Sequence, residues 1–212
     1  IKLGAMMLPL NWRLAEPELL FILNDAEAKG IVYDSEFAAR MPPLHAQSTA
    51  TYGLRLETPG FEAADGAPEF EQAIASATHL LEMNPYTTLD EPMTIMYTAG
   101  TTGRPKGVLI THQMTLYNAI NISNPSGLSR HSIFYAVLPT FHTGGLNLYA
   151  NPVFYHGGVC IVARQYDPAQ TLRVLSDPNL GVTHFFGVPS IYLFLSQQPG
   201  FDEADLSRIT SW

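Results

Sequence analysis

The sequence contains a single cysteine, Cys160, among its 212 residues. One thiol cannot form an intramolecular disulfide, and a zinc site built on several thiolates is excluded as well. Cys160 lies in the apolar run 159–162, where a buried strand thiol is the expected role. No apolar run reaches the roughly 18 residues of a membrane-spanning helix, and no segment resembles a secretory signal. We therefore expect a chain without disulfides or a membrane span, located in the cytoplasm.

Basic residues are also scarce. Lys and Arg together number 11, against 19 Asp and Glu, which gives a formal charge of −8. Nucleic-acid-binding domains carry a basic surface, so this composition argues against a nucleic-acid partner. Hydrophobic residues make up 46% of the chain, an ordinary share for a globular protein with a sizeable core. Composition thus excludes several classes of partner, and the function has to be sought in local motifs.

A stretch rich in glycine and threonine, residues 98–107, follows the apolar residues 93–97. Glycines free the backbone to turn several N–H groups toward one point, and such a concavity attracts phosphate. Threonine hydroxyls add donors, and Arg104 and Lys106 add positive charge. The stretch therefore predicts a phosphate-binding loop, and with it a nucleotide.

The spacing within this loop excludes the common nucleotide motifs. No window fits G-x-x-x-x-G-K-[ST] or G-x-G-x-x-G, because Lys106 precedes Gly107. Residues 95–106 instead resemble, position by position, the AMP-binding loop of the adenylate-forming enzymes, which include acyl-CoA synthetases, nonribosomal adenylation domains and beetle luciferases. Ala99 stands where many members carry serine, so one hydroxyl is lost.

The resemblance implies that the loop binds the phosphates of ATP through its N–H groups and hydroxyls, while the lysine neutralises charge. It also implies that the hydroxyl of Thr102 is a ligand for the accompanying Mg²⁺, which prefers oxygen ligands. The residues that the resemblance assigns to ATP are Thr98, Ala99, Gly100, Thr101, Thr102, Gly103 and Lys106.

A second group of residues, 138–146, lies between a predicted strand (133–138) and a predicted helix (146–155) broken at Pro152. Ligands of open α/β sheets bind at the carboxyl ends of strands. The family carries an aromatic residue near the substrate carboxylate here, and His142 matches it. The resemblance implies that His142 orients the carboxylate or acyl-adenylate and gates the thiol path. The alternative is that His142 only hydrogen-bonds a local carbonyl.

A third stretch, residues 183–190, predicts a buried strand (182–186) that breaks at Gly187 before a helix (190–197). The family has a similar strand–turn–helix that lines the acyl pocket. The alternative is simple core packing by Phe185, Phe186 and Val188, and we expect a structural role for His184. The predicted substrate-pocket residues are Phe141, Gly144, Gly145, Gly187, Val188 and Pro189.

Strands and helices alternate along the whole chain, which predicts an α/β fold with mostly parallel sheets covered by helices. Near the start we expect a short strand at residues 5–10, a helix with Pro17 in its first turn and Gly30 as its C-cap, and a short helix from residue 35 that Pro42 and Pro43 end. By resemblance, residues 1–212 are part of the large N-terminal domain of an adenylate-forming enzyme, with a first α/β portion at about 1–92. Residues 93–212 then hold the phosphate loop and the acyl-site residues. Both ends look cut, so we expect the adenine-binding stretch, the ribose-binding aspartate and the C-terminal domain with its catalytic lysine to lie outside this segment. The segment alone is expected to be inactive.

The resemblance predicts an AMP-forming acyl-CoA synthetase acting on a fatty or aryl acid, with ATP, Mg²⁺ and coenzyme A. The alternative is a nonribosomal-type adenylation domain that loads an amino acid onto a carrier protein. An amino-acid site needs a carboxylate to meet the ammonium group, and no acidic residue lies between Gly127 and Ala163, which favours the first interpretation. A third possibility is a non-catalytic nucleotide-binding module.

Overall fold

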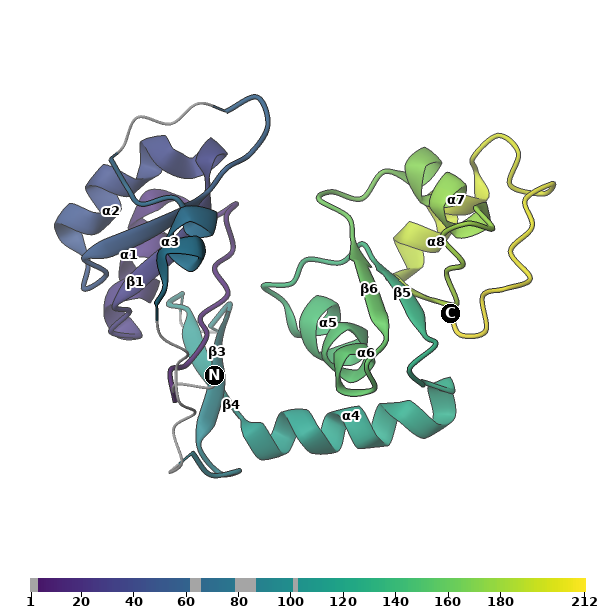
Figure 1. Ribbon diagram of the computed structural model, residues 1–212, viewed down its shortest axis with the longest axis horizontal. Helices are drawn as coiled ribbons and strands as arrows, with labels where there is room; N and C mark the ends of the chain where they lie inside the picture. Colours follow the sequence, from purple (N-terminus) through teal and green to yellow (C-terminus); the bar gives the residue numbers. More distant parts are fainter. Residues whose placement is uncertain (1–3, 62–65, 79–86, 101–102) are drawn as a thin grey trace. The chain divides into compact units, whose positions relative to one another are not determined.

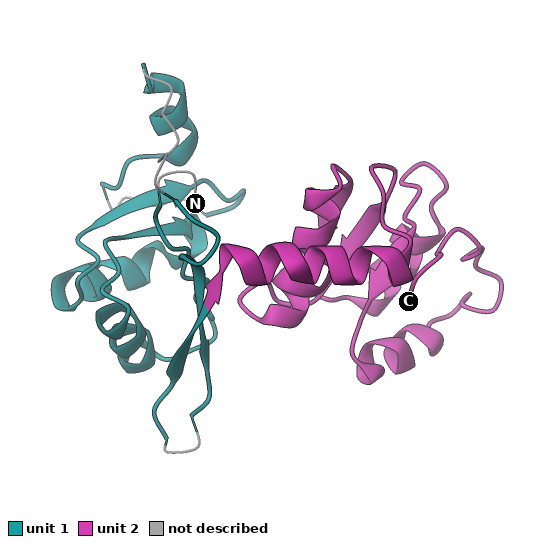
Figure 2. Ribbon diagram, turned by 90° about the horizontal axis from the view of Figure 1, so that it is seen from below, with its two compact units in different colours: residues 1–109 teal, residues 110–212 magenta. Residues whose placement is uncertain are grey.

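The structure, a computed structural model, describes residues 4–61, 66–78, 87–100 and 103–212. They belong to two compact units, unit 1 (Ile1–Leu109) and unit 2 (Ile110–Trp212), which Figure 2 colours separately. Each unit is described by itself. Among the described helices, none has both the length and the hydrophobicity that a bilayer span requires.

Unit 1 opens with a helix, and its first sheet is parallel (Figure 1). As the sequence predicts, Pro17 lies in the first turn of helix α1, and buried residues at helical spacing pack its inner face. Strands β1 and β2 pair in register from Gly30 opposite Tyr52 to Asp34 opposite Leu56, and strands β3 and β4 pair in a second sheet. The elements are α1 (Glu16–Asp25), β1 (Gly30–Asp34), η1 (Ser35–Arg40), α2 (Met41–Gln47), β2 (Tyr52–Leu56), α3 (Phe70–Ser76), β3 (Pro92–Thr98) and β4 (Lys106–Thr111).

Two sequence-based expectations for unit 1 are wrong. A strand was expected at residues 5–10, but only Met7 forms an isolated parallel bridge, with Thr94, since Pro9 lacks the N–H that would extend the pairing. Gly30 was expected to cap helix α1 and instead begins β1. A Cβ at this position would lie 2.5 Å from Cζ of the exposed Tyr52 side chain, so glycine lets that ring lie over the strand.

The prolines at 42 and 43 also differ from expectation. They were expected to end a short helix that begins at residue 35, yet they lie in the first turn of α2, directly after the 3₁₀ turn η1. A proline in the first helical turn removes an N–H that has no partner within the helix. The pair therefore starts a new helix here.

Unit 2 is built on a parallel three-stranded sheet, in the order β6-β5-β7. Phe134 of the central strand pairs with Cys160 on one side and His184 on the other. This confirms the α/β prediction. The elements are α4 (His112–Ser126), β5 (Ile133–Ala136), α5 (Thr143–Gly145), the π-helical turn η2 (Leu146–Ala150), α6 (Asn151–Tyr155), β6 (Val159–Val162), α7 (Pro168–Ser176), β7 (His184–Phe186) and α8 (Pro189–Ser196).

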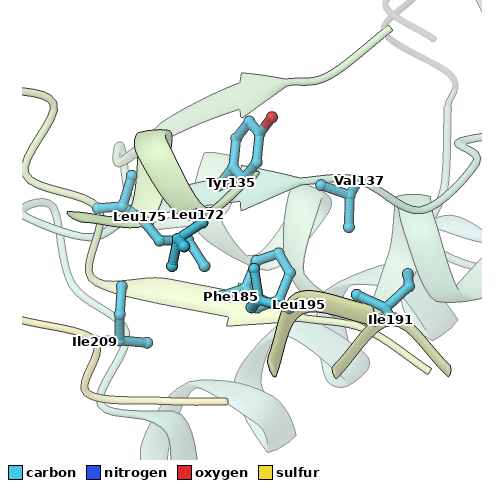
Figure 3. Packing of buried hydrophobic residues seen from close by; sticks show 9 residues of the cluster. Tyr135, Val137, Leu172, Leu175, Phe185, Ile191, Leu195 and Ile209 are labelled. Carbon is cyan, nitrogen blue, oxygen red and sulfur yellow. The ribbon is translucent and has the colours of Figure 1, made fainter. Parts of the chain in front are cut away.

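The central strand β5 is covered on both faces, and its successive residues point to opposite faces. Tyr135 packs into a core with Phe185 and with side chains of α7 and α8 (Figure 3). Its neighbours Phe134 and Ala136 pack on the other face with Tyr149 and Val153. This two-sided burial explains why β5 is apolar throughout.

A buried chain of hydrogen bonds joins four segments of unit 2. The hydroxyl of Tyr149 lies 3.1 Å from that of Ser126 and 2.7 Å from that of Ser211. Nε2 of His184 lies 2.9 Å from the carbonyl oxygen of Ser126, and its Nδ1 lies 2.7 Å from the Thr183 hydroxyl. The His184 side chain is 2% exposed and bonded at both nitrogens, which fits the structural role expected for it.

The helical path across α5, η2 and α6 continues through Pro152, where the sequence predicts an interruption. Proline cannot donate a hydrogen bond to the preceding turn. The chain accommodates it by widening into the π-helical turn, so that the N–H of Asn151 donates to the carbonyl of Leu146. Pro152 then lies in the first turn of α6, and the helical path continues.

The thiol of Cys160 on β6 is half-buried, and burial raises its pKa to about 11. Only the thiolate reacts with alkylating agents, and at pH 8 such a thiol is ionised to about one part in a thousand, against about a quarter for an ordinary cysteine. We expect iodoacetamide to modify the native chain about a hundredfold more slowly than the urea-unfolded chain at pH 8, with the native rate rising up to about pH 11. Mass spectrometry measures both rates, and equal rates at pH 8 would contradict the expectation.

Candidate functional site

The glycine-rich loop of unit 1 connects two neighbouring strands, β3 and β4. The carbonyl of Gly100 accepts a hydrogen bond of 3.2 Å from the N–H of Gly103. Gly103 has a φ of 84°, in the left-handed region that favours glycine. A Cβ at Gly100 would overlap the carbonyl oxygen of Arg104. Both positions therefore require glycine. The predicted ATP ligands Thr101 and Thr102 lie outside the described residues.

The described polar groups of the loop face solvent. Thr98, Ala99, Gly103 and Lys106 are exposed and Gly100 is half-buried, so the Thr98 hydroxyl and the Lys106 ammonium group are accessible to an anion. No group of three or more His, Cys, Asp or Glu side chains that could hold a metal ion occurs in the described part of the chain. The predicted Mg²⁺ ligand, Thr102, belongs to the residues that are not described.

His142 in unit 2 stands at the start of the helical run that follows β5. It is the N-cap of α5, and its Nδ1 accepts a hydrogen bond of 3.1 Å from the N–H of Gly144. An accepting Nδ1 places the proton of the neutral ring on Nε2. The side chain is exposed, so Nε2–H is available to donate to a ligand oxygen. The local bond is thus made to an N–H group, and the alternative of a bond to a carbonyl is not what the structure shows.

Gly144 and Gly145 differ sharply in how much space they have. Gly145 is buried, and a Cβ there would overlap the Pro139 carbonyl oxygen and lie 2.7 Å from that of Leu138. A Cβ at Gly144 would meet nothing closer than 3.4 Å, at Nδ1 of His142. Gly145 is therefore required by the chain's own backbone, whereas Gly144 has room beside the imidazole. Phe141 is half-buried.

Residues 187–189 connect β7 to α8. Gly187 is buried, and a Cβ there would lie 2.7 Å from Cγ2 of Ile191, so this glycine lets the helix approach the strand. Val188 is 46% exposed and Pro189 is exposed as well. Phe185 is fully buried in the core. The core-packing interpretation thus holds for Phe185, while Val188 and Pro189 remain accessible to a ligand.

A hydrogen-bonded set of amide side chains beneath the His142 turn was not predicted from the sequence. The Asn147 side chain is 8% exposed, and its Nδ2 donates to the Thr143 hydroxyl at 3.1 Å. Its Oδ1 accepts from Asn151 at 2.9 Å, and Asn118 of α4 donates to its backbone carbonyl at 2.6 Å. These bonds hold the turn after His142 against α4. The spacing of Thr143, Asn147 and Asn151 at i, i+4 and i+8 was the signal that could have revealed them.

The predicted site residues are therefore distributed over both units. Unit 1 carries the loop, and unit 2 brings together His142 and Gly144 at the start of α5 and holds Gly187 and Val188 before α8. The loop of unit 1 offers hydrogen-bond donors and positive charge to a phosphate. The residues of unit 2 offer one hydrogen-bond donor, the imidazole N–H of His142.

Comparison with known proteins covers both units. The sequence pattern of a family described as "AMP-binding enzyme" matches residues 1–211. A feruloyl-CoA synthase from Amycolatopsis sp is 31% identical over 206 residues, which is 97% of this chain and 38% of that protein. An indoleacetate–CoA ligase from Aromatoleum aromaticum is 27% identical over 208 residues, 98% of this chain and 40% of that protein.

A solved structure gives the same result for the fold. The crystal structure of ATP-bound MatB from Rhodopseudomonas palustris superposes with a TM-score of 0.76 at 27% identity, over 92% of this chain and 36% of that chain. This chain therefore spans about two fifths of the length of the proteins it resembles, with 38% and 40% for the two curated relatives.

Proposed function

Because this chain belongs to the AMP-binding enzyme family, we propose that it forms the phosphate-binding and acid-binding part of an AMP-forming acyl-CoA synthetase. In the proposed reaction a carboxylate oxygen attacks the α-phosphate of ATP, which gives acyl-AMP and pyrophosphate. The thiol of coenzyme A then attacks the acyl carbon, releasing AMP and forming the thioester. The α/β fold is that of the N-terminal domain of adenylate-forming enzymes.

The observation that carries this proposal is the loop between β3 and β4. Transfer at a phosphoryl centre needs charge neutralisation and positioning more than covalent help. Thr98 at the end of β3 and Lys106 at the start of β4 are both exposed beside the loop. We assign the loop residues Thr98 to Gly103 and Lys106 to the β- and γ-phosphates, which leave as pyrophosphate. Thr102 is the proposed ligand of the Mg²⁺ that accompanies ATP, whose remaining ligands are chiefly water.

His142 is assigned to the carboxylate. A neutral imidazole whose Nδ1 is held by Gly144 presents Nε2–H as a single, oriented donor. That donor fits one oxygen of the acid, or the carbonyl oxygen of the acyl-adenylate. Phe141, Val188 and Pro189, with the glycines beside them, are the proposed lining of the acyl pocket.

An aryl acid is the proposed substrate class. The names of the two curated relatives, feruloyl-CoA synthase and indoleacetate–CoA ligase, both denote aryl acids. An amino-acid substrate would need a carboxylate for its ammonium group, and residues 127–163 contain no Asp or Glu. A fatty acid is the competing substrate class, and the test below compares pyrophosphate exchange with aryl acids and with a fatty acid.

The test is acid-dependent exchange of pyrophosphate into ATP by the complete protein. We expect exchange with ferulate, indoleacetate or a related aryl acid, and weaker exchange with decanoate. Stronger exchange with decanoate would replace the aryl acid by a fatty acid. ATP binding without exchange for any carboxylic acid would reject the synthetase and favour a nucleotide-binding module.

Replacing His142 with alanine in the complete protein is expected to raise the KM for the acid about tenfold, because one hydrogen bond to a charged carboxylate is lost. The KM for ATP should stay within about twofold, since the loop is unchanged. The matched control is His131→Ala, which removes an exposed imidazole of the same unit. Steady-state kinetics in both substrates measures the split, and an unchanged KM for the acid would remove His142 from the carboxylate site.

A further inference from the structure

Tyr97 is the residue immediately before Thr98 on β3, and its hydroxyl makes a hydrogen bond to a residue far away in the sequence. The hydroxyl donates a hydrogen bond of 2.6 Å to Oδ2 of Asp25, the last residue of α1. Side chains alternate along a strand, so Tyr97 and Ile95 share one face, and Thr98 points to the other. Thr98 is exposed, so its side chain is accessible to a ligand on the face opposite the Tyr97–Asp25 bond.

The ring of Tyr97 also contacts the strand on the far side of the loop. A Cβ at Gly107 would lie 3.1 Å from Cζ of Tyr97 and 2.7 Å from Cδ1 of Ile95. Glycine at 107 is thus what lets these two side chains lie against β4. The ring consequently fixes the two strands where the loop leaves one and enters the other.

Asp25 lies at the carboxyl end of α1, where its negative charge is unfavourable. The carboxyl end of a helix carries partial negative charge, so a carboxylate in the last turn is disfavoured, and α1 has no basic residue there. A charge-assisted hydrogen bond from Tyr97 offsets this cost. Burial is the largest cause of a pKa for Tyr97 well above its usual range, and the hydrogen bond to Asp25 and the negative charge of Asp25 raise that pKa further. The hydroxyl therefore keeps its proton.

The end of α1 is itself held rigidly. The Asn24 side chain donates to the carbonyl of Gln47 at 3.1 Å and accepts from the N–H of Thr49 at 2.9 Å. The Thr49 hydroxyl donates to the carbonyl of Leu23 at 3.0 Å. Asp25 therefore lies in a segment held by several hydrogen bonds, and its own bond to Tyr97 connects that segment to the end of β3.

We propose that Tyr97 and Asp25 are positioning residues for the ATP-binding loop. Their hydrogen bond, here called the brace, holds the end of β3 against α1 and so sets the positions of Thr98 and Lys106, which lie at the two strand ends beside the loop. This rests on the proposed function for the identity of the ligand. Neither side chain touches the nucleotide; the hydrogen bond and the ring contact with Gly107 act through the loop.

The test uses the complete protein and the variants Tyr97→Phe and Asp25→Ala. Each is expected to raise the KM for ATP about fivefold, because displaced Thr98 and Lys106 side chains would bind the phosphates less well, while the KM for the acid stays within about twofold. Asp25→Asn, whose Oδ1 still accepts a hydrogen bond, should restore most of the loss. The double variant Tyr97→Phe/Asp25→Ala should be no worse than either single variant, since all remove the same bond.

The matched control is Tyr166→Phe, which loses a tyrosine hydroxyl bonded to the carbonyl of Ile191 at 2.8 Å and should leave the KM for ATP unchanged. Calorimetry of ATP binding to the wild type and Tyr97→Phe runs in parallel. Wild-type protein without acid-dependent exchange would reject the proposed function, and the calorimetric comparison would still test the brace. Equal ATP affinity in the two proteins, equal rises in both KM values, additive single variants or no ATP binding at all would overturn the brace.

Discussion

Truncating Phe185 to alanine is expected to lower the free energy of unfolding of unit 2 by about 3–5 kcal/mol. Phe185 is fully buried at the centre of the core between β5, β7 and the helices α7 and α8 (Figure 3). Its ring stacks on that of Tyr135 at 6.3 Å and meets those of Tyr192 and Trp212 edge-on at 5.9 and 6.1 Å. Alanine would leave a cavity walled by aromatic rings, which cannot collapse into it fully.

Urea unfolding followed by tryptophan fluorescence measures this loss. The chain has 2 tryptophans, and in a Trp12→Phe background the signal comes from Trp212, beside the truncated ring. The matched control is Phe154→Ala, because Phe154 is 57% exposed in the same unit and should cost less than about 1 kcal/mol. Similar losses for the two variants would show that the β5–β7 core is not what stabilises unit 2.

Gly145→Ala is expected to destabilise unit 2 by about 3 kcal/mol, whereas Gly144→Ala should change its stability by less than about 1 kcal/mol. The added methyl at 145 would lie 2.6 Å from the carbonyl carbon of Pro139, and backbone cannot rotate away as a side chain can. At 144 the nearest atom is 3.4 Å away. Adjacent glycines that look equivalent in the sequence thus differ in what they permit.

The same urea titration separates these two variants, and acid-dependent exchange provides a second measurement. Because the His142 cap depends on the turn between Pro139 and Gly145, Gly145→Ala should lose activity together with stability. Gly144→Ala keeps the backbone N–H that His142 accepts from and should stay folded. A Gly145→Ala protein as stable as the wild type would mean that the close approach to Pro139 relaxes at little cost.

The alternation of elements was predictable because its signals are local. Pro17, Pro168 and Pro189 each fall in the first turn of a helix, and apolar runs of short length became the parallel strands of unit 2. Sequence alone did not distinguish a proline that ends a helix from one that begins the next. At positions 42 and 152 the outcome depends on whether the preceding turn can tighten into a 3₁₀ helix or widen into a π turn, which tertiary packing decides.

The sequence indicated candidate site residues only where they are consecutive, as in the glycine–threonine loop and the turn around His142, and their roles stay predictions. The tie between Tyr97 and Asp25 could not be predicted, because the partners are 72 residues apart and neither type of residue indicates the other. The tautomer of His142 likewise depends on a backbone N–H that the turn brings to Nδ1.

The buried hydrogen-bond chain through Tyr149 has a consequence for the way unit 2 opens. Ser126 ends α4, His184 lies on β7, and Ser211 follows α8, and all are bonded through or beside one phenol. Separating any one of these segments would leave partly buried polar groups on the others without hydrogen-bond partners. Opening of one segment is therefore coupled to opening of the other segments in the chain of bonds. Amide protons in α4, β7 and the segment around Ser211 should consequently exchange with solvent at a common slow rate, as members of one cooperative opening unit.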